Sequence, residues 1–350
     1  MTQPKRPFRP NVIAVVLVLG LIAFIAYFYF FINPAQVITI LSQLNPFVYA
    51  GAFVAYCLYV FLSSLVWQRL LNGVSAKIST RKALLYTWVG LFFEATIPQL
   101  GWSGEVSKTY LLSKESKLDA GKIGASVVGQ KIFVMTMTVV ALGAGLLLVL
   151  TSYPSLDILV VFLIALVLAL SILTLAAVYY VSVKPSATKT LLSWAIKLVL
   201  FFKRSWNPEG FRLKAEQILG DFHLSIAQLR ANPKGLILPA ICTTASFVCE
   251  VSVVFLSFAA LGQSVPIGIV LIVFTLTGTL QTVGVTFFGF PEVIMSASFS
   301  ALGIDPSLGF SVTLLTRVVN LWFRLIVSYV ALQWAGIQIY RKNKTPQTNS

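Results

Sequence analysis

Long apolar runs, separated by short polar segments, recur along almost the whole chain. Their approximate ranges are 11–32, 46–66, 83–101, 124–151, 157–183, 235–262, 266–290 and 306–338. A helix of about 20 such residues is long enough to cross a hydrocarbon core of roughly 30 Å. The pattern therefore predicts an all-α, polytopic integral membrane protein with a single membrane domain over residues 1–350.

The composition supports this class and excludes others. Of the 350 residues 57% are hydrophobic and only 11% are charged, too few for an ordinary soluble domain. The net charge of +15 fits basic loops on the cytoplasmic side of a membrane better than a nucleic-acid partner. Cys57, Cys242 and Cys249 lie inside apolar runs without metal-ligand spacing, so neither a disulfide framework nor a metal or other cofactor is expected.

The distribution of Lys and Arg decides the topology. If all eight runs crossed the membrane, 13 basic residues in 103–122 and 184–234 would lie opposite the N-terminus, against the positive-inside rule. The conflict disappears if 83–101 and 266–290 enter the membrane, break near 98–101 and 288–291, and return. Then 23 of the 26 Lys and Arg residues face one side. We therefore predict six full spans and two re-entrant hairpins in the cell membrane, with both termini cytoplasmic.

The two hairpins enter from opposite faces and share a plan. Each has a broken apolar run, a Glu, a short helix and then a span with a basic residue. Glu105 precedes Lys131 by 26 positions, and Glu292 precedes Arg317 by 25. We interpret 83–151 and 266–338 as an inverted repeat, the architecture with which secondary transporters place a site near the midplane.

Residues 184–234 between the two repeats have a different pattern. Leu191, Trp194 and Leu198 share one helical face, flanked by Lys189 and Lys197, and a second amphipathic stretch follows. Basic amphipathic helices of this kind lie in the headgroup plane. The segment is predicted to be a cytoplasmic linker on the membrane surface.

Ionisable side chains within the apolar runs are the candidate functional residues, because each costs about 2.5–3.5 kcal/mol to insert. They could instead form structural ion pairs, and Arg324 could extend its side chain to the headgroups. The sequence leaves open whether Glu94 and Glu250 are functional. The ionisable residues at this depth are Glu94, Glu105, Lys131, Glu250, Glu292, Arg317 and Arg324.

Polar stripes suggest that these residues surround a cavity. Threonines in a membrane helix also bond their own backbone, so such stripes are ambiguous. Buried Lys and Arg beside helix ends suit a phosphate or another anion, and apolar walls suit acyl or polyprenyl chains. The stripes are Thr313, Arg317, Asn320 and Arg324; Thr275, Thr279, Thr282 and Thr286; and Ser126, Gln130 and Lys131.

Two motifs resemble a known family. Residues 98–112 read PQLGWSGEVSKTYLL, and the later GFPE of 289–292 precedes TLLTR at 313–317. In this order they resemble the two signatures of the flippase-like membrane domain of lysylphosphatidylglycerol synthases. The resemblance covers roughly 50–340 and implies a polytopic fold that translocates lipid between leaflets. It makes Glu105, Lys108, Glu292 and Arg317 the counterparts of the family's signature residues.

The chain also departs from that family. Where its members show Glu-Arg-x-x-Asp after the first signature, this chain has Gln130, Lys131 and Val134, so both acids are missing. A different lipid substrate is one expectation. No aminoacyl-transferring domain follows the membrane region, so lipid synthesis by this chain is not expected.

The leading prediction is transbilayer translocation, by a flippase or scramblase, of an anionic or polyprenyl-phosphate lipid. No catalytic residue is assigned, and the predicted substrate-binding or coupling residues are Glu105, Lys108, Lys131, Glu292, Arg317 and Arg324. Glu105 and Glu292 either hold the hairpin ends or exchange protons, and Glu292 is the expected resting partner of Arg317.

Two alternatives remain. One is a membrane glycosyltransferase that uses a polyprenyl-phosphate donor, and the other is an accessory protein of a lipid-linked glycan pathway. The enzyme would need carboxylates at a membrane face, but Asp157 and Asp305 are far apart in sequence and His223 lies in the linker.

Overall fold

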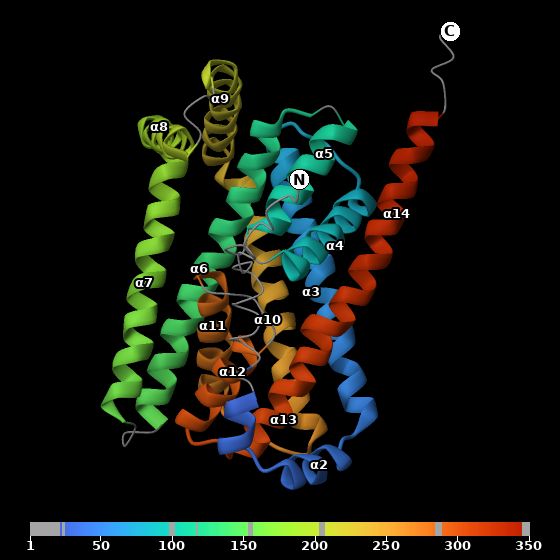
Figure 1. Cartoon of the computed structure of the whole chain (residues 1–350), viewed down its shortest axis with the longest axis vertical. Helices are drawn as coiled ribbons and strands as arrows, with labels where there is room; N and C mark the ends of the chain where they lie inside the picture. Colours follow the sequence, from blue (N-terminus) through green and yellow to red (C-terminus); the bar gives the residue numbers. More distant parts are fainter. Residues whose placement is uncertain are drawn as a thin grey trace, which may run out of the picture.

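The computed structural model describes residues 22, 25–97, 102–116, 118–152, 157–202, 207–283 and 289–344. Throughout these ranges the regular structure is helical, without a strand (Figure 1). The helices are α2 Pro34–Ser42, α3 Pro46–Gly73, α4 Thr80–Thr96, α5 Ser103–Ser116, α6 Ala120–Ser152, α7 Ile158–Val183, α8 Pro185–Phe202, α9 Glu209–Ala231, the 3-10 helix η1 Pro233–Leu236, α10 Ile237–Ala260, α11 Ile267–Val283, α12 Phe290–Ala301, α13 Pro306–Arg317, the π-helix η2 Val318–Phe323 and α14 Arg324–Lys344.

Five helical segments are long and apolar enough to cross a membrane. They are α3, α6, α7, η1 with α10, and the last segment Pro306–Ile337. A sixth candidate is the pair formed by Ile25–Phe31 and α2, which is bent by 89°. Most of the first predicted span, 11–32, lies outside the described residues. The predicted all-α, polytopic membrane class is confirmed.

Two pairs of shorter helices occupy opposite ends of the bundle (Figure 1). The pair α4 and α5 lies at the end that carries α8 and α9, and the pair α11 and α12 lies at the end that carries α2. At 1.5 Å per residue even the longest of the four, with 17 residues, spans only about 26 Å. This arrangement is the one that re-entrant hairpins require. The first predicted break, 98–101, lies outside the described residues, whereas the second, 288–291, is described from Gly289 onward.

Helix starts follow from local sequence. Asn45 and Asp305 each precede a proline, and their side-chain oxygens accept backbone N–H groups of the following helix. Proline is pre-organised for the first helical turn, and such caps satisfy otherwise unpaired donors. These caps begin α3 and α13 at the bundle end that carries α2 (Figure 1).

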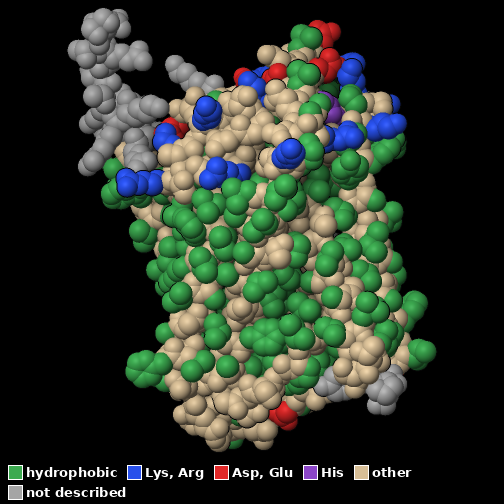
Figure 2. All heavy atoms as spheres, turned by 180° about the vertical axis from the view of Figure 1, so that it is seen from behind, with side chains coloured by type: hydrophobic (Ala, Val, Ile, Leu, Met, Phe, Trp, Pro, Cys, Tyr) green, Lys and Arg blue, Asp and Glu red, His purple; other side chains and the backbone are tan. Residues whose placement is uncertain are grey.

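The surface shows how the bundle meets a membrane. Figure 2 shows apolar side chains around the middle of the molecule and Lys and Arg gathered at one end. At that end α8 lies across the end of α7 (Figure 1) and exposes Leu191, Trp194 and Leu198. The Thr188 hydroxyl and His223 Nε2, 2.7 Å apart, join α8 to α9, and burial lowers the pKa of His223. The lone histidine is therefore a structural contact of the linker.

Candidate functional site

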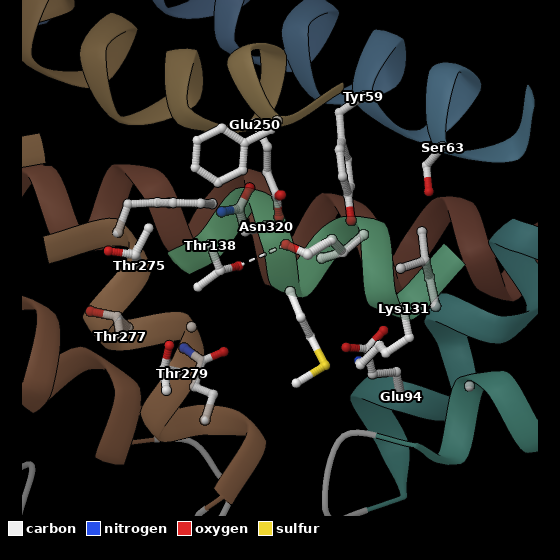
Figure 3. A pocket seen from close by; sticks show the side chains of 18 of the residues that line it. Tyr59, Ser63, Glu94, Lys131, Thr138, Glu250, Thr275, Thr277, Thr279 and Asn320 are labelled. Carbon is white, nitrogen blue, oxygen red and sulfur yellow. Dashed lines mark hydrogen bonds between the residues drawn. The ribbon is translucent and has the colours of Figure 1, made fainter. Parts of the chain in front are cut away.

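One cavity of about 450 Å³ lies between the two hairpins, and the central helices contribute to its wall. Figure 3 shows Glu94 and Lys131 on one side of it and Thr275, Thr277 and Thr279 on the other. Five of the six predicted site residues line it: Glu105, Lys108, Lys131, Arg317 and Arg324. The sixth, Glu292, contacts Arg317. The structure thus brings together residues from both signatures that are far apart in sequence.

In the second repeat, Glu292 of α12 and Arg317 of α13 form a close ion pair. Arg317 Nε donates to Glu292 Oε1 at 2.7 Å, and the Glu292 side chain is only 1% exposed. Its other oxygen, Oε2, accepts the backbone N–H of Gly289 at 2.8 Å. Gly289 has a φ of 102°, a conformation that glycine adopts without strain. The expected pair is present, and the same carboxylate caps the start of α12.

In the first hairpin the corresponding pair is looser. Lys131 Nζ lies 3.6 Å from Glu105 Oε1 and 5.3 Å from the centre of the Trp102 ring. Glu105 Oε2 is buried and, among the described residues, has no hydrogen-bond partner. The Ser103 hydroxyl donates instead to the carbonyls of Phe93 and Ile97 at the end of α4. This hairpin therefore holds its helix ends together without using the signature carboxylate.

Lys108 is a buried cation whose close contacts are neutral groups, while Glu105, Lys131 and Glu94 act on it electrostatically from farther away. Only 8% of the residue is exposed, and its Nζ donates to Gln130 Oε1 at 3.2 Å. The ammonium also lies 4.9 Å from the centre of the Trp67 ring. Gln130 is fixed in turn because its amide donates to the carbonyl and hydroxyl of Ser63. Within the described ranges no carboxylate lies within 4.0 Å of Lys108.

Arg324 turns into the cavity instead of extending to the headgroups. It interacts electrostatically with Glu94 of α4, Glu250 of α10 and Tyr56 of α3. Its Nε is buried without a hydrogen-bond partner in the part of the chain that the structure describes. Figure 3 shows Glu250 close to Tyr59 and Asn320. Glu94 and Glu250 thus belong to the cavity wall.

The predicted polar stripes are only partly right. Thr313 is fully buried outside the cavity lining, and Thr316 lines it instead. Between Arg317 and Arg324 the last span passes through the π-helix η2, which changes the angular spacing that an α-helix would give. Ser126 is also buried away from the cavity, where it accepts the Trp67 N–H. The side chain of Thr282 and all of Thr286 lie outside the described residues.

Three polar residues of α3 line the cavity but are not among the predicted site residues. Tyr56, Tyr59 and Ser63 follow one another at helical spacings of three and four and face the cavity. That spacing of polar tips in an apolar helix was the available signal. Across the described ranges no group of three or more His, Cys, Asp or Glu residues could hold a metal ion.

The fold and the site define a polytopic helical membrane protein with an ionisable cavity between two hairpins. The chain belongs to the family of the lysylphosphatidylglycerol synthase transmembrane region, whose model matches residues 11–328. The predicted resemblance to this family is thereby confirmed.

The relatives are full-length matches at low identity. A UPF0104 membrane protein of Methanothermobacter thermautotrophicus is 22% identical over 94% of this chain and 97% of its own length. Another, of Methanocaldococcus jannaschii, is 23% identical over 93% of this chain and 94% of its own. No solved structure shows a significant match.

Proposed function

We propose that the protein moves an anionic or polyprenyl-phosphate lipid across the cell membrane, with its basic end in the cytoplasm. The observation that carries the proposal is Lys108. A buried ammonium whose close contacts are an amide and an indole ring keeps a strong attraction for an anion. Because this ammonium lies in the wall of a cavity, that anion can come from outside the protein.

The size of the cavity supports a headgroup as the occupant. A volume of about 450 Å³ lies within the usual range of roughly 300–1,000 Å³ for small-molecule sites. It accommodates a phosphate-bearing headgroup but not two acyl chains. Val134 of α6 and Val167 and Leu170 of α7 add apolar surface to the wall, beside the polar lining residues of the same helices. The lipid chains therefore stay in the bilayer while the headgroup crosses inside the protein.

The family name adds a substrate class to test. Its lysylphosphatidylglycerol synthases act on a phosphatidylglycerol lipid by name, so an anionic phospholipid is the first probe for this chain. A polyprenyl phosphate is the second probe, because it presents the same phosphate chemistry on a different tail.

The test is lipid movement in proteoliposomes. Vesicles carry fluorescent phosphatidylglycerol, phosphatidylcholine or a polyprenyl phosphate, and dithionite quenching follows each lipid. We expect the anionic probes to move at least tenfold faster than in protein-free vesicles, and Lys108→Gln to lose most of that rate. Lys108→Arg should retain much of it, since it keeps a positive charge at this position.

The matched control is Lys197→Gln, which removes an exposed lysine of α8. It should move lipid at the parent rate. If the parent protein moves neither anionic probe, the proposed function is wrong. If Lys108→Gln moves both at the parent rate, Lys108 is not the headgroup site.

A further inference from the structure

A second cluster of charged side chains lies in the wall of the same cavity as Lys108, with which Glu94 also interacts electrostatically. Glu250 from α10, Glu94 from α4 and Arg324 at the start of α14 interact electrostatically. Among the described residues, no ion pair within 4.0 Å and no hydrogen bond involves the carboxylates of Glu94 or Glu250. Two carboxylates thus share the field of one guanidinium in a cavity at membrane depth.

The other groups that face Glu250 come from each neighbouring element. Tyr56 and Tyr59 of α3 lie beside it, and both interact electrostatically with it. Lys131 of α6 and Arg317 of α13 line the same cavity, while α11 contributes only uncharged residues. Lys131 and Arg317 are each paired with the glutamate of their own repeat. Lys108 interacts electrostatically with Glu94 as well, and Arg324 is the cation that interacts with both Glu94 and Glu250.

The charges of the whole site balance when it is empty. Four acids and four bases line the cavity or pair with a residue that does: Glu94, Glu105, Glu250 and Glu292 against Lys108, Lys131, Arg317 and Arg324. An anionic headgroup adds at least one negative charge to this neutral set. Because a net charge at membrane depth is unfavourable, entry of the headgroup favours uptake of a compensating proton.

The distances between the glutamates and their nearest cations indicate which carboxylates bind that proton. Glu105 and Glu292 each already face a cation within 4.0 Å. Glu94 and Glu250 lack such a contact and repel each other. We propose that these two carboxylates form a proton-binding site that is loaded when an anionic headgroup enters, so that lipid and proton cross together.

This proposal rests on the proposed function, and its step conserves protons and charge. A proton from the aqueous phase forms an O–H bond on one carboxylate oxygen, and that bond breaks on the other side when the headgroup leaves. No electron is transferred. One proton accompanies each added negative charge.

The experiment measures both movements in the same vesicles. Proteoliposomes that contain the pH dye pyranine and fluorescent phosphatidylglycerol in one leaflet are followed for lipid movement and lumenal pH. We expect about one proton per lipid, and a lipid rate that falls as the pH rises. Glu250→Gln should abolish the proton movement and make the lipid rate independent of pH, whatever that rate is.

Glu209→Gln, in an exposed turn of α9, is the matched control and should keep the coupling. If Glu250→Gln does not fold, Glu250→Asp and Glu94→Gln provide the test, and each should shift the pH profile. Lipid movement without proton movement in the parent protein overturns the coupling and leaves the proposed function intact. An unchanged pH profile in the folded glutamate variants overturns the assigned site.

Discussion

The two hairpins use the same kinds of residue with different geometry. In the second, Glu292 and Arg317 are 2.7 Å apart, and the carboxylate also caps α12. In the first, Glu105 and Lys131 are 3.6 Å apart, and each side chain is 18% exposed. A carboxylate with two good partners and 1% exposure stabilises a helix end. A looser, more exposed pair exchanges partners at lower cost.

The first hairpin also carries a cation that has no counterpart in the second hairpin. Lys108 on α5 is held by neutral groups, whereas no Lys or Arg occurs in α11 or α12. Glu115 of α5 joins the two helices of the first hairpin, because it pairs with Lys82 of α4 and accepts a hydrogen bond from the hydroxyl of Tyr86 in the same helix. We infer that the second hairpin is chiefly a rigid support and that the first binds the headgroup.

The largest expected effect concerns the faces to which the two hairpins open. In a variant without the three native cysteines, Thr190→Cys and Lys114→Cys should react with an impermeant maleimide only from the cytoplasm. Ser264→Cys, at the start of the second hairpin, should react only from outside. All three positions are exposed, so access alone decides the labelling. Labelling of Lys114→Cys and Ser264→Cys from one side would contradict opposite hairpins.

The next effect is the loss of the tight pair. Arg317→Ala leaves Glu292 buried without its cation, which should lower the free energy of unfolding by about 3–5 kcal/mol. Arg317→Lys should fold with a smaller loss but lose much lipid movement, because an ammonium cannot reproduce the planar guanidinium. Thermal unfolding and lipid assays on the same preparations check both. Equal stabilities for Arg317→Ala and the parent would show that the pair is not structural.

A smaller effect is expected where the helices of the first hairpin cross. A Cβ on Gly104 would lie 2.6 Å from the carbonyl oxygen of Gly90. Gly104→Ala should therefore push α4 and α5 apart and cost about 1–3 kcal/mol. Gly143→Ala is the control, since a Cβ there meets nothing within 4 Å and adds helix propensity. Similar unfolding temperatures for the two variants would contradict the close crossing.

Much of the fold was predictable because apolar length and charge distribution act over whole segments. The pairing of Glu292 with Arg317 was predictable from their matching places in the repeat plan. The contribution of Tyr59 was not predicted, since a tyrosine in an apolar helix usually serves packing. The π-helix at 318–323 was not predicted either, because its extra residue per turn leaves no mark in hydrophobic periodicity. Those local features decide which polar side chains reach the cavity.

The smallest expected loss of stability is that of Glu105→Gln, and its comparison with Glu292→Gln separates the two signature glutamates. Glu105→Gln removes the charge from a pair 3.6 Å apart, so it should cost less than about 1 kcal/mol. Glu292→Gln removes it from a buried pair that also caps a helix, and should cost about 2–3 kcal/mol. Glu105→Gln should nevertheless change lipid movement, since it removes a negative charge from the cavity wall that acts on Lys108. Thermal unfolding and lipid assays on both variants provide the measurement. Equal destabilisation by the two substitutions would mean that the hairpins are equally rigid, and headgroup binding would no longer be assigned to the first.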